Sequence, residues 1–261
     1  MKYIITGTEG FIGKAVLEAI ESAGHYAWTI HQDKNWYGDK LSLEMSVKHC
    51  DGIFHIGAIS DTTEHDPNYM LYWNYSTSKI LFDLARKYNK KVVYSSSAAC
   101  YGDGDGIPNN IYGWSKLLAE EYGLKSCERF VALRYFNVYG PGEEYKGKMA
   151  SVAYQAHKAG EFKLFPGDIK RDFVFIDDVV HANIHAMTLE RGVFDVGTGQ
   201  AETFNNLVSG MGIPYEYHTE DKIPTWYQYF TQADKNKFMP GWKPLYDVSQ
   251  GTEKYKEYLK R

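Results

Sequence analysis

A short serine run, a tyrosine and a lysine are the side chains in this sequence most able to do chemistry together. Ser95–Ser97 end an apolar run, and Tyr112 is followed four residues later by Lys116. Side chains four residues apart on a helix share one face. A nearby ammonium favours phenolate over phenol, so we expect Lys116 to lower the pKa of Tyr112 and let it exchange a proton with a substrate hydroxyl. With Ser97 bonded to the same oxygen, the three groups could surround a nicotinamide ring, as in an oxidoreductase.

Position, more than spacing, distinguishes this tyrosine. The Tyr-x-x-x-Lys spacing also occurs at Tyr75 and Tyr154, as chance allows for so short a motif. Only Tyr112 follows shortly after an apolar strand that ends in hydroxyl groups, and wound α/β sheets bind ligands where their strands end. The alternatives are a tyrosine on a helix surface and a Ser97 that only caps a turn. We favour the catalytic interpretation.

A glycine turn near the N-terminus supplies the matching cofactor site. Lys2–Thr6 is a short apolar run, Gly7, Gly10 and Gly13 follow it, and a helical pattern runs on to Ile20. Glycines allow a tight turn, a close approach of the backbone to a pyrophosphate and close packing of helix on sheet. The phosphates would lie at the positive end of the helix. The order of strand, turn and helix predicts a bound dinucleotide.

Composition excludes several other classes of protein. The 261 residues are 44% hydrophobic with a formal charge of −4, which suits a globular chain and offers no basic surface for nucleic acid. The three cysteines have no disulfide or zinc spacing, so we expect no metal site and a reducing, cytoplasmic location. No apolar run is long enough to cross a membrane.

Alternating strand and helix patterns predict an α/β protein with a Rossmann-type, doubly wound parallel sheet. Only 20 residues separate His31 from Gly52, so we expect this sheet to be slightly trimmed. We expect a dinucleotide-binding lobe of residues 1–140, to which 171–199 return as a strand and an N-capped helix. A smaller C-terminal substrate lobe would contain 141–170 and 200–261. The expected strands are 26–31, 52–56, 91–96 and 129–133, and the expected helices include 72–88 and 115–124.

Further motifs extend almost from end to end and carry a resemblance to a known family. The chain resembles the extended short-chain dehydrogenases/reductases of the nucleotide-sugar epimerase kind, and most closely their ADP-L-glycero-D-manno-heptose 6-epimerase branch. Many relatives share the glycine turn, Tyr112 and Lys116, whereas the later motifs point to the heptose branch. Those later motifs are residues 165–167, 170–174, 197–199 and 227–234, and residues 146–152 precede them.

The resemblance implies an epimerase that oxidises its sugar transiently and reduces it again from the opposite face. Hydride passes from the sugar to the nicotinamide, the ketone turns over, and the same hydride returns. Such a reaction needs a second base, and Lys146 stands at the family's position for it. An ammonium must lose its proton to act as a base, so burial would have to depress its pKa. The alternative is a solvated loop lysine, or a phosphate contact alongside Lys148.

The same residue-by-residue comparison implies which residues bind the ligands. The expected partner is a nucleotide-diphosphate sugar, and we expect neither nucleic acid nor a membrane as a partner. Arg171 has an independent reason, because a guanidinium fork suits a diphosphate, and its alternative is an ion pair with Asp168 or Asp172. The catalytic set is Tyr112, Lys116, Ser97 and Lys146. The cofactor set is Gly7, Gly10, Phe11, Ile12, Gly13, His31, Gln32, Asp33, Lys34, Gly57, Ala58, Ser60, Asn74, Tyr112, Lys116 and Val138. The substrate set is Ser97, Asn137, Lys146, Lys148, Gln155, Phe165, Pro166, Gly167, Asp168, Arg171 and Tyr227.

The form of the cofactor depends on the end of the second strand. An acid there would hold a free ribose 2′-hydroxyl, but the sequence reads His31, Gln32, Asp33, Lys34. If His31 holds the position, a 2′-phosphate is tolerated and Lys34 could pair with it. We therefore expect NADP, with NAD as the alternative. The oligomeric state stays open, and a homo-oligomer is compatible with the sequence.

Three other functions compete with the heptose epimerase. A UDP-hexose 4-epimerase shares Ser97, Tyr112 and Lys116 but needs no second base, and the short loop between Ser97 and Tyr112 borders the sugar site. A 4,6-dehydratase is disfavoured, because Ala98 and Ala99 stand where an Asp-Glu pair would be needed. A sensor that binds nicotinamide without turnover would have no need of a tyrosine and lysine in catalytic spacing.

Overall fold

A computed structural model describes residues 1–30, 40–220, 223 and 228–261, apart from the side chain of Lys148. The contacts divide the chain into two units with interleaved sequences. Unit 1 contains Met1–Arg134 and Val180–Phe194, and unit 2 contains Tyr135–Val179 and Asp195–Arg261. The expected boundaries fell after residues 140, 170 and 199. In the structure they fall after 134, 179 and 194, so a shorter segment returns to unit 1.

Unit 1 is built around a six-stranded sheet with the order β2-β1-β3-β4-β5-β9. The pairs β1–β2, β1–β3 and β3–β4 are parallel. Strand order reverses between β1 and β3, which is where wound sheets bind their ligands. The strands are β1 (Lys2–Thr6), β2 (Tyr26–Ile30), β3 (Gly52–His55), β4 (Lys91–Ser97), β5 (Phe130–Tyr135) and β9 (Gly192–Val196).

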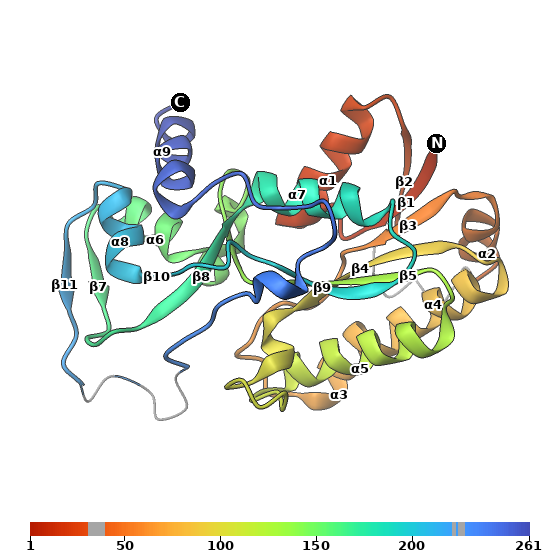
Figure 1. Cartoon of the computed structure of the whole chain (residues 1–261), viewed down its shortest axis with the longest axis horizontal. Coiled ribbons are helices and arrows are strands. Elements are labelled where there is room, and N and C mark those ends of the chain that lie inside the picture. Colours follow the sequence, from red (N-terminus) through yellow and green to blue (C-terminus); the bar gives the residue numbers. More distant parts are fainter. Residues whose placement is uncertain (31–39, 221–222, 224–227) are drawn as a thin grey trace. The chain divides into compact units, whose positions relative to one another are not determined.

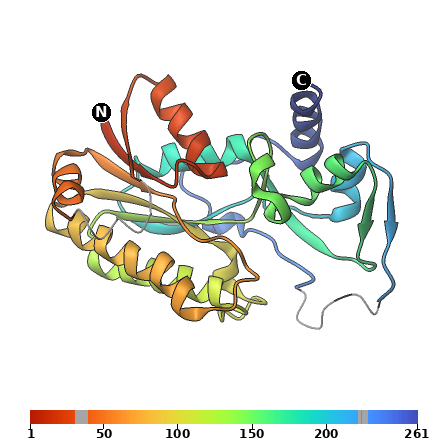
Figure 2. The same ribbon diagram turned by 180° about the vertical axis from the view of Figure 1, so that it is seen from behind.

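Helices cover both faces of this sheet, which confirms the predicted Rossmann-type fold. In Figures 1 and 2, α1 and α7 lie on one face, and α4 and α5 run side by side on the other. Among residues 40–51, the described part of the short segment before β3, the chain forms the helix α2. The helices are α1 (Phe11–Ser22), α2 (Lys40–His49), α3 (Pro67–Leu71), the π-helical turn η1 (Tyr72–Ser76), α4 (Thr77–Lys87), the 3₁₀ turn η2 (Ala98–Tyr101), α5 (Ile111–Ser126) and α7 (Ile176–Ala186).

The core beneath α2, α4 and α5 is apolar and fully enclosed. Val47 of α2, Leu81 and Phe82 of α4 and Ala119 of α5 pack against inward side chains of the sheet such as Tyr94. Each of these side chains is completely buried. Burying an aliphatic or aromatic side chain stabilises a fold by about 1.5–3 kcal/mol. This packing fixes the height of α5 above the carboxyl end of β4.

Unit 2 has two small sheets and its own core. In the first sheet β8 lies between β10 and β6, and in the second β11 pairs with β7. Ala156, Leu164 and Val208 form the centre of a core under the second sheet. The elements are β6 (Asn137–Tyr139), η3 (Glu144–Met149), α6 (Val152–Ala159), β7 (Phe162–Leu164), β8 (Lys170–Phe175), β10 (Ala201–Thr203), α8 (Phe204–Gly210), β11 (Tyr215–Tyr217), η5 (Lys235–Lys237) and α9 (Val248–Leu259).

The strand that was expected to return to the first lobe belongs to unit 2. It is β8, which pairs in parallel with β6 and antiparallel with β10, and these pairings hold it there. The helix after it begins at Ile176, so Asp177 and Asp178 lie in its first turn and do not cap it. The Asp178 carboxylate accepts from the backbone of Leu245 and Tyr246. The apolar run 173–176 is typical of any buried strand and does not reveal its sheet.

No helix among residues 1–30, 40–220, 223 and 228–261 has the length and apolar character needed to cross a membrane.

Candidate active site

The start of α5 fixes the position of Tyr112. Asn110 caps the helix by accepting from the backbone nitrogen of Gly113 at 2.8 Å. A Cβ on Gly113 would lie 2.6 Å from the carbonyl oxygen of Ala99, so the first turn of α5 can rest on η2 only because this residue is glycine. Ser97 precedes η2 directly and caps it through the nitrogen of Ala99. Tyr112 and Ser97 are therefore brought together by the contact of α5 with η2.

Ser97 and Tyr112 interact directly. Burial raises the pKa of Tyr112 to about 12, and a hydrogen bond with the Ser97 side chain works against this rise. Ser97 thus caps a turn, which was its alternative interpretation, and also contacts the phenol, whereas its bond to a substrate oxygen stays a prediction. Bringing Tyr112 to a reactive state near neutral pH requires a further positive group or hydrogen bond donor at the phenol.

Lys116 lies differently from our expectation. Its ammonium stands 4.4 Å from the centre of the Tyr94 ring, and its side chain is 2% exposed. Burial lowers the pKa of Lys116 to about 8, and the nearby Glu120 opposes this. The expected lowering of the phenol pKa is not found, because the ammonium rests on Tyr94 and burial disfavours its charge.

Asn74 connects α5 to the loop after β3. Its side-chain oxygen accepts from the nitrogen of Ile59 at 2.7 Å, and its amide nitrogen donates to Ile59 O and to Ser115 Oγ at 2.9 Å each. Ser115 then donates to the carbonyl oxygen of Tyr112 at 2.7 Å. Asn74 is buried within the π-helical turn η1. The structure thus places Asn74 as a tie between the catalytic helix and the backbone, and its predicted contact with the cofactor stays a prediction.

A buried ion pair behind the site did not emerge from the sequence. Glu120 is completely buried and pairs with Arg134, with Nη2 to Oε1 at 2.5 Å and Nε to Oε2 at 3.1 Å. Ser96 donates to Glu120 at 2.6 Å. The guanidinium also lies over the Tyr101 ring. The available signal was Glu120 one helical turn after Lys116, with Arg134 at the end of an apolar strand.

The glycine turn fits a dinucleotide. Gly7 has φ +72°, and a Cβ there would lie 2.6 Å from the Cα of Gly57. A Cβ on Gly13 would lie 2.0 Å from the carbonyl oxygen of Gly7. Gly10 precedes α1, whose first turn has no acidic residue and no side-chain cap. The backbone amides at the start of this helix are thus available to a pyrophosphate.

The remaining predicted cofactor residues are distributed over both units. Phe11 is buried in α1, and Ile12 follows it. Ala58 and the exposed Ser60 lie in the loop after β3, close in sequence to Gly57. Val138 lies on β6 of unit 2. His31, Gln32, Asp33 and Lys34 lie outside the described residues.

In unit 2, Lys146 lies in the short helical turn η3. Its backbone nitrogen bonds to the carbonyl of Glu143 at 3.0 Å, and Gly147 beyond it has φ +56°. Burial lowers the pKa of Lys146, and the buried Glu143 carboxylate opposes this shift. A lysine with a depressed pKa meets the requirement stated for a second base.

Among the described residues, Asp168 and Asp172, the alternative partners of Arg171, have other partners. Arg171 is buried on β8, donates to the carbonyl oxygens of Lys170 and Gln228, and lies 5.8 Å from the Phe204 ring centre. Asp168 pairs with Lys170 at 2.9 Å. The Asp172 carboxylate accepts from Thr198, Gly199 and Ala233.

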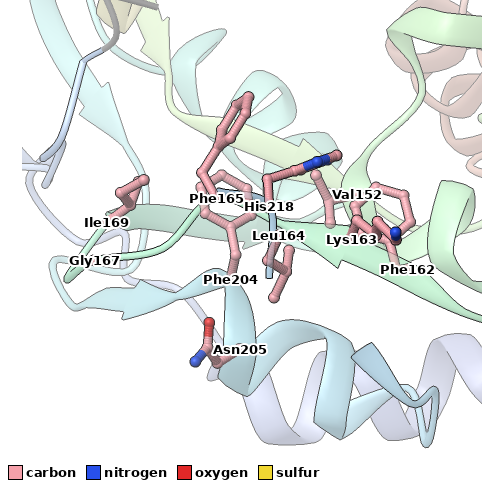
Figure 3. A pocket seen from close by; sticks show the side chains of 10 residues that line it. All are labelled: Val152, Phe162, Lys163, Leu164, Phe165, Gly167, Ile169, Phe204, Asn205 and His218. Carbon is pink, nitrogen blue, oxygen red and sulfur yellow. The ribbon is translucent and has the colours of Figure 1, made fainter. Parts of the chain in front are cut away.

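Unit 2 contains a hollow of about 240 Å³, lined in part by Phe165, Phe204 and His218. In Figure 3, Gly167 and Ile169 lie at one end of it, and Val152, Phe162 and Lys163 at the other. The Phe165 and His218 rings are 5.5 Å apart at 42°. Two aromatic rings with a few polar groups suit the binding of a flat heterocycle. The sequence predicted Phe165 and Gly167 here and missed His218 and Phe204.

The other predicted substrate residues have more varied positions. Asn137 is exposed on β6, and the Gln155 side chain donates to the carbonyl of Ala150 at 2.6 Å. Pro166 is half-buried between Phe165 and Gly167. Tyr227 and the side chain of Lys148 lie outside the described residues.

Comparison with known proteins identifies the family of the chain. A sequence profile of the NAD dependent epimerase/dehydratase family matches residues 3–197. The chain belongs to this family. It is therefore an enzyme of the nucleotide-sugar epimerase type that uses a nicotinamide dinucleotide, as the sequence predicted.

Solved structures of epimerases resemble the whole chain. ADP-L-glycero-D-manno-heptose-6-epimerase from Helicobacter pylori is 32% identical, with a TM-score of 0.85, 99% of this chain covered and 96% of the other. UDP-N-acetylglucosamine 4-epimerase from Methanobrevibacter ruminantium M1 is 26% identical, with a TM-score of 0.85 and coverages of 99% and 97%. UDP-glucose 4-epimerase from Thermotoga maritima is 24% identical, with a TM-score of 0.83 and coverages of 100% and 99%, and shows the shared fold.

The lowered pKa of Lys116 predicts a specific stability cost. Its folded pKa of about 8 lies below the unfolded value of 10.5, so at pH 7 burial of the charged form opposes folding. The difference corresponds to roughly 3 kcal/mol. Between pH 8 and 10.5 the folded state sheds its proton first, so this cost disappears as pH rises. We expect Lys116→Met, without cofactor, to exceed the wild type in unfolding free energy at pH 7, and by much less at pH 10.

Urea unfolding of both proteins at the two pH values measures this. A variant that is equally stable at pH 7, or whose advantage does not shrink with pH, would contradict the assignment of a buried, charge-disfavouring site to Lys116.

Proposed function

We propose that this member of the family is an ADP-glycero-manno-heptose 6-epimerase, or acts on a close relative of that nucleotide sugar. The observation that carries the proposal is Lys146, a partly buried lysine with a lowered pKa in addition to Tyr112 and Ser97. A 6-epimerase of this type needs two bases, and a 4-epimerase with a rotating intermediate needs one. The 32% identity to a heptose epimerase over nearly the full chain supports the same conclusion.

The residues of unit 1 would handle one proton of the reaction. Ser97 would hold the reacting sugar oxygen, and Tyr112 would take its proton as the hydride leaves the sugar carbon. Lys116 would bind the cofactor and favour the phenolate once the site is filled. The buried ties through Asn74 and Glu120 keep these groups from shifting when the substrate changes geometry.

The residues of unit 2 would bind the nucleotide and supply the second proton site. Phe165 and His218 would flank the base of the nucleotide. Arg171 would face the diphosphate, and its N–H groups would then donate to phosphate oxygens in place of backbone carbonyls. Lys146 would give a proton to the sugar oxygen when the hydride returns to the opposite face. Asn137, Gln155 and Tyr227 complete the proposed set.

The cofactor would be NADP, held at Gly7–Gly13 and supplying a hydride acceptor that is regenerated in each turnover. The described part of β2 runs to Ile30, opposite Thr6 at the end of β1, and His31 is the next residue in the sequence. An acid at this point would favour a free 2′-hydroxyl, and the sequence has none until Asp33. The three free, buried cysteines support a reducing compartment such as the cytoplasm.

A panel of nucleotide sugars tests the proposed reaction. The purified enzyme is expected to invert the ADP-heptose in deuterium oxide without taking deuterium into the inverted carbon, as NMR can show. Lys146→Met is expected to lose about 10²- to 10⁴-fold in rate while still binding cofactor, because one general base is missing. The matched control is Lys158→Met, which removes an exposed lysine from α6.

Full epimerisation by the Lys146→Met variant would contradict the two-base mechanism and favour turnover of UDP-hexoses at C4. Tight cofactor binding without turnover of any nucleotide sugar would instead favour a nicotinamide sensor.

Binding titrations test the form of the cofactor. NADPH is expected to bind at least about tenfold more tightly than NADH, since an ion pair between Lys34 and the 2′-phosphate would be worth on the order of 1–2 kcal/mol. Lys34→Glu should reverse this order. Tighter binding of NADH by the wild type would assign NAD.

A further inference from the structure

One fully buried histidine has no part in the reaction described above. His55 ends β3, is 0% exposed, and lies within a hydrogen bond of a hydroxyl on each side. Its Nδ1 is 2.8 Å from Thr6 Oγ1, and its Nε2 is 2.7 Å from Ser78 Oγ. The Phe82 and Tyr94 rings enclose it. The alternative interpretation is a core histidine whose two ring nitrogens are hydrogen-bonded but have no functional role.

The neighbouring bonds fix which nitrogen carries the proton. Thr6 Oγ1 accepts from the backbone nitrogens of Ile56 at 3.0 Å and Gly57 at 2.9 Å, so its own hydrogen is left to donate to Nδ1. Ser78 donates to the carbonyl oxygen of Asn74 at 2.6 Å, so it must accept from Nε2–H. His55 is therefore neutral, with its proton on Nε2.

The burial of His55 agrees with this. Desolvation, together with a smaller effect of the nearby Lys116, lowers the pKa of His55 to about 3. The tautomer thus stays the same throughout the working pH range.

The bonds on the Nδ1 side lead to the cofactor turn. Thr6 directly precedes Gly7. A Cβ on Gly7 would lie 2.6 Å from the Cα of Gly57, so the two backbones are in close contact. The same Thr6 oxygen holds the Gly57 nitrogen. Its orientation therefore sets the spacing of the two loops that would bind the dinucleotide.

The bonds on the Nε2 side lead to the catalytic helix. Ser78 holds the carbonyl of Asn74, and Asn74 holds Ser115, which donates to the Tyr112 carbonyl. The chain of bonds is continuous from Thr6 to Tyr112, and every step is between atoms of unit 1.

We propose that His55 is a positioning residue that couples the dinucleotide-binding loops to the catalytic helix through its two ring nitrogens. Its Nδ1 orients Thr6 and so shapes the cofactor site. Its Nε2–H orients Ser78 and Asn74 and so sets the register of Tyr112. The inference depends on the dinucleotide chemistry of the family and not on which sugar is turned over.

Two substitutions separate the two sides of the ring. In His55→Asn the side-chain oxygen can replace Nδ1 and accept from Thr6, while the bond to Ser78 is lost. In His55→Gln the amide nitrogen can replace Nε2–H and donate to Ser78, while Thr6 loses its acceptor. Val47→Ala is the matched control, since it weakens the same core from α2 without touching the chain of bonds.

The measurements are the dissociation constant of NADPH, the turnover number with the nucleotide sugar that the panel identifies, and the ¹⁵N shifts of His55 in the cofactor-free wild type. His55→Gln is expected to bind NADPH roughly tenfold more weakly. His55→Asn is expected to keep its affinity and lose on the order of 10- to 100-fold in turnover number. Wild-type His55 should show a protonated Nε2 and a bare Nδ1 at pH 7.

A charged ring, or a proton on Nδ1, would overturn the proposal even if neither variant folds. It is also overturned if both variants match Val47→Ala in affinity and turnover, or if the two variants are affected alike. The shifts and the affinity need no substrate, so failure of the proposed sugar leaves this test intact.

Discussion

The structure depends on one constraint, that the buried amide and charged side chains beneath α5 find partners, although the buried Tyr94 hydroxyl has none among the described residues. An unsatisfied buried polar group costs about 1–3 kcal/mol, and an unpaired buried charge costs more. Asn74 with Ser115, and Glu120 with Arg134 and Ser96, meet this requirement in one arrangement of the helix on the sheet. A slip of α5 by one turn would break both sets. Tyr112 is held beside Ser97 because no other register satisfies these groups.

The same burial gives the site its electrostatic character. It raises the pKa of Tyr112 to about 12 and lowers the pKa of Lys116 to about 8, so burial works against the charged form of each side chain, although Lys116 still holds its proton at pH 7. A neutral phenol costs little to bury but gives up its proton slowly. Phosphates and ribose hydroxyls supplied by a dinucleotide would bring charge and hydrogen bonds to these residues. Reactivity would then arise when the site is filled, which protects the resting enzyme from the cost of a buried phenolate.

The sequence predicted what depends on local chemistry. Gly7 and Gly13 had to be glycine, Tyr112 stood out by its place after a strand, and the short spacing before Gly52 indicated a trimmed sheet. It could not show which sheet accepts the apolar run around Phe173, because either sheet buries such a run equally well. It also missed Glu120, Arg134 and His55, since a charged or polar residue becomes a buried tie only through partners far away in the chain. The orientation of Lys116 toward Tyr94 was likewise a matter of packing.

The central claim is that Tyr112 exchanges the proton that accompanies transient oxidation of the sugar. Mixing the NADP-loaded enzyme with its nucleotide sugar should produce a transient absorbance of reduced nicotinamide. Tyr112→Phe should bind cofactor and sugar as the wild type does and show no such transient within the time of many wild-type turnovers. Formation of reduced nicotinamide by this variant at the wild-type rate would contradict the account.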